Sequence, residues 1–126
     1  MILFDWKKFY DVGFCMRNIS KKEEFQRSAV GRYYYAAFGT VKNYYEERYQ
    51  TTIPSKDTHR FLISELKNSK IQNEREIGKN LDKFRKIRNH ADYNSIFYLS
   101  NVRKAEKYYK NIIELLNQLE NENFNS

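Results

Sequence analysis

The chain is predicted to fold as an all-α protein, a compact up-down bundle of four or five helices. Proline occurs once and glycine four times in 126 residues, so few positions interrupt a helix. Apolar residues recur every three or four positions through most of the chain, which is the period of a helix with one buried face. The segments between these periodic stretches are short, and short connections favour antiparallel neighbouring helices.

The first two helices are expected on either side of a short polar turn. The first carries its apolar face at Trp6, Phe9, Tyr10 and Gly13. It ends near Asn18. Ser20 and Glu23 then have the spacing of a capping box, in which Ser20 is the N-cap and Glu23 reaches back to it. The second helix is therefore expected to begin at Ser20 and, from its apolar spacing, to continue to about Tyr49.

Pro54 marks the clearest break in the helical pattern, because it disfavours a helical conformation at the preceding Ile53. A shorter third helix is expected from about Asp57 to Lys67. Residues 68–73 are mostly polar and are predicted to form a loop.

The last two helices follow this loop. The fourth is expected to run from about Glu74 to Asn94. The fifth has the strongest apolar pattern, with alternating steps of three and four through Val102, Ala105, Tyr109, Ile112, Leu116 and Leu119. That face can pack inside the bundle or against a second copy of the chain. Residues 121–126 form a polar tail that is expected to fray, and the whole chain, 1–126, has about the length of one domain.

Composition excludes several classes of protein. No apolar run approaches the roughly 20 residues of a spanning helix, and the N-terminus lacks a signal-peptide pattern, so a cytoplasmic protein without a membrane partner is expected. The lone Cys15 allows no internal disulfide and no multi-cysteine zinc site, and it is predicted to be a small buried residue. His59 and His90 are too few for a clustered ligand set, so no metal and no cofactor are expected.

The charge balance favours an acidic partner. Lys and Arg number 23 against 16 Asp and Glu, a net charge of +7, which makes nucleic acid the first partner to consider. Residues 33–35 are three tyrosines that could stack on unpaired bases. The preferred interpretation is that these tyrosines lie on a helix and contribute to the core and to a dimer interface. A basic cluster near the first turn (Arg17, Lys21, Lys22 and Arg27) is read as a solvated face.

The fourth helix carries one charged residue on its apolar face. With Phe84 at zero and about 100° per residue, Arg88 falls at about 40°, inside the stripe, and Arg85 lies at its edge. His90 falls at about −120°, away from the stripe. A guanidinium buried there must be paired, and Asp92, four residues on, can supply part of the partner. The pair is either a structural tie within the bundle or part of a polar site in a helix-lined cleft.

Two sequence motifs lie on the second and fourth helices. Residues 32–38 read Arg-Tyr-Tyr-Tyr-Ala-Ala-Phe, and residues 88–93 read Arg-Asn-His-Ala-Asp-Tyr. They are similar to the R-x-Y-Y-A-x-F and R-x-x-A-D-Y motifs of one bacterial branch of HEPN domains, which are small helical modules of toxins and antiviral nucleases. Between the motifs, His59 opens the third helix where many relatives carry a histidine. Without the resemblance, His59 is interpreted as a cap or interface residue. The resemblance covers roughly residues 5–119.

The resemblance implies a metal-independent endoribonuclease that acts on RNA as a homodimer, with an R-x4–6-H motif from each subunit at a shared cleft. Arg88 and Arg85 would hold the phosphate and stabilise the transition state, and His90 would act as acid or base. The supporting residues would be Asn89, Asp92 and Tyr93. Counted from Arg88, the motif's histidine position falls on Tyr93, whereas His90 completes R-x4-H when the count starts at Arg85.

The resemblance also implies a biological setting. Such proteins act as toxins or phage-defence effectors, and some pair with a nucleotidyltransferase antitoxin that modifies a tyrosine beside the motif, for which Tyr93 is the candidate here. The alternative is a non-catalytic HEPN module that binds a nucleotide, a nucleic acid or a partner protein and serves as antitoxin, sensor or scaffold.

Overall fold

The computed structural model describes residues 4–125 and confirms the all-α prediction, because these residues form five helices and no strand. The helices are α1 (Lys8–Ile19), α2 (Glu23–Tyr49), α3 (Thr58–Lys67), α4 (Gln72–Tyr93) and α5 (Ser100–Asn125). None of the described helices is both long enough and apolar enough to cross a bilayer.

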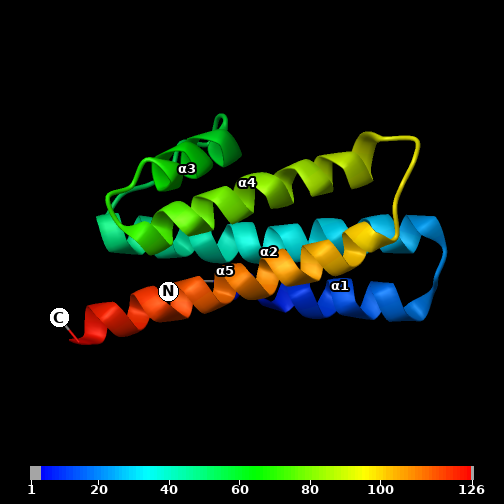
Figure 1. Cartoon of the computed structure of the whole chain (residues 1–126), viewed down its shortest axis with the longest axis horizontal. Helices are drawn as coiled ribbons and strands as arrows, with labels where there is room; N and C mark the ends of the chain where they lie inside the picture. Colours follow the sequence, from blue (N-terminus) through cyan, green and yellow to red (C-terminus); the bar gives the residue numbers. More distant parts are fainter. Residues whose placement is uncertain (1–3, 126) are drawn as a thin grey trace.

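The bundle is built around α2, which packs against α1, α4 and α5 (Figure 1). The long helices follow one another up and down along the long axis of the molecule, and the short α3 lies against α4 at one end. This arrangement is the up-down bundle that short connections favour.

The core is rich in aromatic residues and contains small residues where helices come close. Tyr33 and Tyr34 of α2 and Phe84 of α4 are fully buried in this core. Gly13 faces α2 so closely that an added Cβ would lie 2.8 Å from the Tyr33 ring. The glycine therefore lets α1 approach α2 at a distance that a larger residue would prevent.

The face of α5 with the strongest apolar pattern packs inside the bundle. Its buried members are Val102, Ala105, Ile112, Leu116 and Leu119. Tyr109 is half-buried and stacks on Tyr10 with 4.4 Å between ring centroids. The structure extends this helix to Asn125, past the point where the polar sequence predicts fraying.

Two predictions for the connection between α1 and α2, the start of α2 and the capping box, are wrong. α2 begins at Glu23, with Lys22 rather than Ser20 as N-cap and no side-chain cap. The Ser20 hydroxyl accepts a hydrogen bond from the Lys22 N–H, while the buried Gln26 side chain donates to the carbonyl oxygens of Arg17 and Ser20 at 3.0 and 2.8 Å. The side chain of Gln26 thus holds the turn in place of the predicted capping box.

Cys15 is exposed, contrary to the prediction that it is buried. The reason is the register of α1. Gly13 faces α2, and a residue two positions later lies about 200° around the helix, on the solvent side.

One buried carboxylate ties the start of α4 to α2. Glu74 is 1% exposed and accepts hydrogen bonds from the hydroxyl groups of Tyr44 (2.6 Å), Tyr49 (2.7 Å) and Ser69 (2.6 Å). Arg48 lies 3.8 Å from it and supplies the opposite charge. Its place in the first turn of α4 adds the favourable field of a helix N-terminus.

We expect Glu74→Ala to lower the free energy of unfolding by about 3 kcal/mol, because it leaves a cation and three hydroxyl groups without their shared acceptor. Urea unfolding followed by circular dichroism measures the change. Glu76→Ala is the matched control, since the Glu76 side chain on the same helix is 43% exposed and pairs with Lys79, and it should change stability by less than about 0.5 kcal/mol. Equal effects of the two substitutions would contradict the role of the buried carboxylate.

Candidate functional site

Arg88 lies buried in the second half of α4, as its place on the helical wheel predicts, with 9% of its surface exposed. Its guanidinium carbon lies 5.1 Å from the ring centroid of Tyr34 and 5.4 Å from that of Tyr35, both on α2. Its Nη1 donates a hydrogen bond of 3.2 Å to Oδ2 of Asp92. The charge is therefore stabilised by two aromatic faces and one carboxylate.

The ion pair with Asp92 does not use the full capacity of Arg88. Within residues 4–125 the guanidinium, which has five N–H donors, makes this one hydrogen bond, and its Nε is buried without a partner. The Asp92 side chain is 38% exposed, so the pair by itself contributes little stability. Donor groups therefore remain for a ligand that carries oxygen atoms.

His59 joins this site from the first turn of α3. Its Nδ1 lies 2.7 Å from the hydroxyl oxygen of Tyr34, and its ring stacks on Phe38 with 3.9 Å between centroids. Burial and the nearby positive charges of Arg88 and Arg85 lower the pKa of His59 to about 4. His59 is therefore neutral at pH 7, and Tyr34 links it to Arg88.

Arg85 lies one turn before Arg88, half-buried, and its Nε is buried without a partner among the described residues. It borders two hollows on the α3 side of α4. One lies toward the N-terminus of α3 and contains His59, and the other lies beside Lys67 and Asp82. Two guanidinium groups thus flank the same neutral imidazole.

His90 lies apart from this cluster. α4 stays helical through Tyr93, so His90 and Arg88 point in directions roughly 160° apart around the helix. The His90 ring stacks on Tyr98 at 5.9 Å, and its Nδ1 is buried without a partner in the described chain. Of the predicted site residues, the fold brings together Arg85, Arg88 and Asp92.

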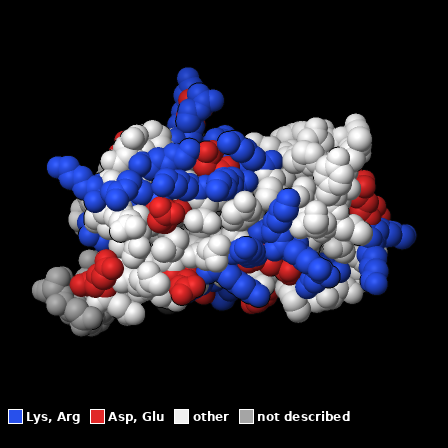
Figure 2. Space-filling model, in the orientation of Figure 1, with Lys and Arg blue, Asp and Glu red and all other residues white. Residues whose placement is uncertain are grey.

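The end of α4 and the following loop expose four large apolar side chains, here called the α4-end surface: Tyr93 (80%), Ile96 (65%), Tyr98 (58%) and Leu99 (64%). This part of the molecule carries few charges on the face drawn in Figure 2, whereas Lys and Arg gather over α3 and α4 and over the middle of α5. An exposed apolar group of this kind is typical of an interaction surface.

Arg27 holds the α4-end surface in place. It donates hydrogen bonds from α2 to the carbonyl oxygens of Ala91 (2.8 Å), Asn94 (2.6 Å) and Ser95 (3.2 Å). Its guanidinium also lies 5.2 Å from the ring centroid of Phe97. The sequence reading of Arg27 as part of a solvated face is wrong, because these carbonyl groups come from residues more than 60 positions away.

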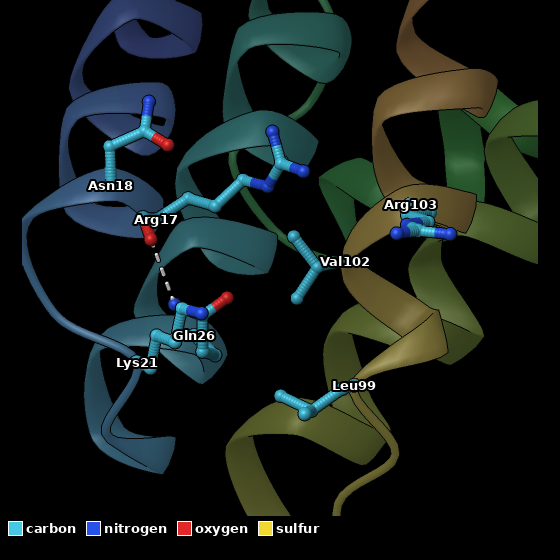
Figure 3. Close-up of a pocket in the computed structure, with 7 residues that line it drawn as sticks. All are labelled: Arg17, Asn18, Lys21, Gln26, Leu99, Val102 and Arg103. Atoms are coloured by element: carbon cyan, nitrogen blue, oxygen red, sulfur yellow. Dashed lines mark hydrogen bonds between the residues drawn. The ribbon is translucent and has the colours of Figure 1, made fainter.

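A second basic hollow, of about 340 Å³, lies between the end of α1 and the start of α5 (Figure 3). Its lining includes Arg17, Lys21 and Arg103 but no carboxylate. In Figure 3, Arg17 reaches across from α1, and Val102 and Leu99 enter from the α5 side. Glu106 partly neutralises Arg17 at 3.3 Å, so this hollow is a weaker anion site than the pair of arginines on α4.

Neither site has the donor set of a metal centre. Among the described residues, no group of three His, Cys, Asp or Glu side chains is placed to ligate a metal ion. The sequence pattern predicts Arg88 inside the apolar stripe of α4 and Arg85 at its edge, and it indicates that His59 is a cap or interface residue, which agrees with its contacts to Tyr34 and Phe38. Its position at the start of a helix after Pro54 gave no sign that α3 would fold over Arg85.

Comparison with known protein families identifies the HEPN domain. The model of this family matches residues 16–122, which include α2 to α4, most of α5, and His59, Arg85, Arg88 and Asp92. No curated protein and no solved structure matches the chain.

The low pKa of His59 predicts a pH-dependent stability. The unfolded chain binds a proton near pH 6.5 and the folded chain only near pH 4, so stability is full above about pH 6.5 and falls as the pH drops toward 4. His59→Gln should lose less stability than the parent between pH 7 and pH 4.5, as measured by urea unfolding. His90→Gln is the matched control. A parent and a His59→Gln variant with the same pH profile would contradict the assignment.

Proposed function

Because the chain belongs to the HEPN domain family, we propose that it is a homodimeric, metal-independent endoribonuclease that serves as a toxin or phage-defence effector. The observation that carries this proposal is the buried Arg88 with unused N–H donors, one turn from Arg85. A planar guanidinium matches the geometry of phosphate oxygens, and a partly dry site strengthens the interaction.

RNA fits the charge of the chain. The net charge of +7 favours binding to a phosphate backbone, and the basic side chains over α3, α4 and α5 offer contacts beyond the two arginines (Figure 2). In this proposal Arg88 and Arg85 hold the scissile phosphate and stabilise the charge that develops on it during cleavage. Asn89 and Asp92 shape the site around them.

A homodimer would bury the α4-end surface. A twofold interface uses the same patch on both copies, and the four exposed apolar side chains at the end of α4 and in the following loop provide such a patch. His90 lies beside this surface through its stacking on Tyr98. It is therefore proposed as acid or base in the assembled dimer, where it would meet the cleft shared by the two subunits.

The second candidate function is a non-catalytic module that binds a nucleotide or a partner protein. The observation that favours it is the uninterrupted helix from Arg88 to Tyr93, which keeps His90 away from Arg88 within one subunit. Tyr93, which is 80% exposed in the single chain, is accessible there for modification by a nucleotidyltransferase antitoxin, whereas the proposed homodimer would cover it.

Expression in bacteria tests the nuclease proposal. The parent chain alone is expected to slow growth and cleave RNA, and Arg88→Ala to reduce cleavage by at least about 100-fold, because a donor to the transition state is lost. Arg88→Lys, which keeps the charge without the fork, and circular dichroism of each variant separate a lost contact from a lost fold.

Relief of toxicity by Arg88→Ala but not by His90→Ala would remove His90 from the mechanism. A parent chain that neither slows growth nor cleaves RNA, expressed without a partner protein, would refute the nuclease proposal.

The dimer proposal predicts that Ile96→Asp converts the protein from about twice its chain mass of 15.4 kDa to a monomer, because a buried charge at the interface is not compensated. Light scattering after size-exclusion chromatography measures the mass. Ile19→Asp is the matched control, since Ile19 on α1 is 67% exposed, close to the 65% of Ile96, but lies outside the α4-end surface. A parent that is already monomeric at micromolar concentration would count against the homodimer.

A further inference from the structure

A cavity of about 430 Å³ lies beside the arginine pair, between Trp6, which stands two residues before α1, the middle of α2 and the N-terminus of α3. Six of its lining residues matter here: Trp6, Tyr35, Phe38, Lys42, His59 and Arg85. Arg85 belongs to both the cavity and the proposed phosphate site. A ligand in the cavity can therefore extend onto Arg85.

Aromatic rings form the walls of this cavity. Phe38 and His59 stack on each other, and Tyr35 lies edge-on to His59 with 6.1 Å between centroids. Trp6 is seated directly on Gly39, where an added Cβ would overlap the indole ring. The chain thus places an indole over α2 at a position that only glycine accommodates, which gives the cavity a flat apolar wall.

The polar groups of the cavity select the charge of its ligand. Lys42 and Arg85 carry positive charge, and Lys42 is partly neutralised by Glu46 at 3.5 Å. Asp57 is the one acidic residue that lines the cavity, while His59 is neutral at pH 7. Aromatic walls alone would also suit an organic cation, but two basic side chains disfavour one. The Nδ1 of His59 is occupied by Tyr34, so a ligand would meet its Nε2. A flat, aromatic ligand attached to an anion fits this set of groups.

We propose that this cavity binds one unpaired nucleobase of an RNA strand, whose adjoining phosphate lies on Arg85 and Arg88. The proposal rests on the RNA-directed function above and adds a base-binding subsite to it. Stacking on aromatic side chains accepts any base, so the subsite anchors single-stranded RNA rather than reading one sequence. A free nucleotide has the same chemistry, and the experiment separates the two sources.

Trp6 is the only tryptophan of the chain, so its fluorescence reports on this cavity alone. The full-length protein is titrated with three probes: a single-stranded RNA oligomer with 2′-O-methyl riboses that resist cleavage, adenosine monophosphate, and ribose 5-phosphate. We expect the oligomer to quench Trp6 at the lowest concentration, the nucleotide to quench it at higher concentration, and ribose 5-phosphate, which lacks a base, to leave it unchanged.

If the nucleotide quenches Trp6 but the oligomer binds without quenching it, the RNA-strand proposal is overturned in favour of a free nucleotide. Quenching by neither would overturn the cavity as a base site.

Substitutions give an independent readout through the anisotropy of a labelled oligomer. Trp6→Ala should weaken binding about tenfold, which is the loss of one stacked base, and Trp6→Phe should restore most of it. Phe14→Ala is the matched control, because Phe14 is an aromatic residue of α1 that is 46% exposed and does not line the cavity. Equal affinity of Trp6→Ala and the parent would overturn the proposal.

The two proposals fail in different ways. If RNA is bound with quenching of Trp6 but never cleaved, the nuclease function is refuted and the base subsite stands. If Trp6→Ala binds and cleaves RNA like the parent while Arg88→Ala does not cleave it, the subsite is refuted and the nuclease function stands.

Discussion

The guanidinium of Arg88 lies between α2 and α4, at a position where the apolar periodicity of α4 predicts an apolar side chain. Removal of a charge from water must be compensated, and the surrounding residues are arranged to do so. Tyr34 and Tyr35 present ring faces, Asp92 presents a carboxylate, and Tyr34 in turn fixes His59. The choice of tyrosine rather than an aliphatic residue on α2 therefore follows from the arginine on α4.

Polar contacts fix α4 along α2 at both ends. At the start, Glu74 receives hydrogen bonds from Tyr44 and Tyr49 and the charge of Arg48. At the end, Arg27 binds the carbonyl groups that a helix C-terminus leaves without partners. Arg88 lies between these anchors. Its position is thereby fixed from both sides, as the phosphate-binding role proposed for it requires if the group is not to reorganise when a ligand arrives.

The two faces of α4 offer different chemistry. One face joins Arg88 and Arg85 to the neutral His59 of α3 and to an aromatic cavity that suits a nucleobase. The other places His90 beside the apolar α4-end surface. Since His90 and Arg88 point apart on an unbroken helix, an acid–base role for His90 depends on a second copy of the chain.

The sequence by itself determined the helices, their order and the burial of Arg88, because apolar periodicity and the position of a single proline depend only on residues that are neighbours in the sequence. It failed where the outcome depends on residues distant along the chain. Cys15 faces solvent because Gly13 meets Tyr33, and Arg27 binds carbonyl groups at the end of α4 and in the loop that follows it. No sequence pattern indicated that α3 brings His59 onto Tyr34. Only the tertiary structure decided these contacts, since their free energy comes from partners that no local pattern specifies.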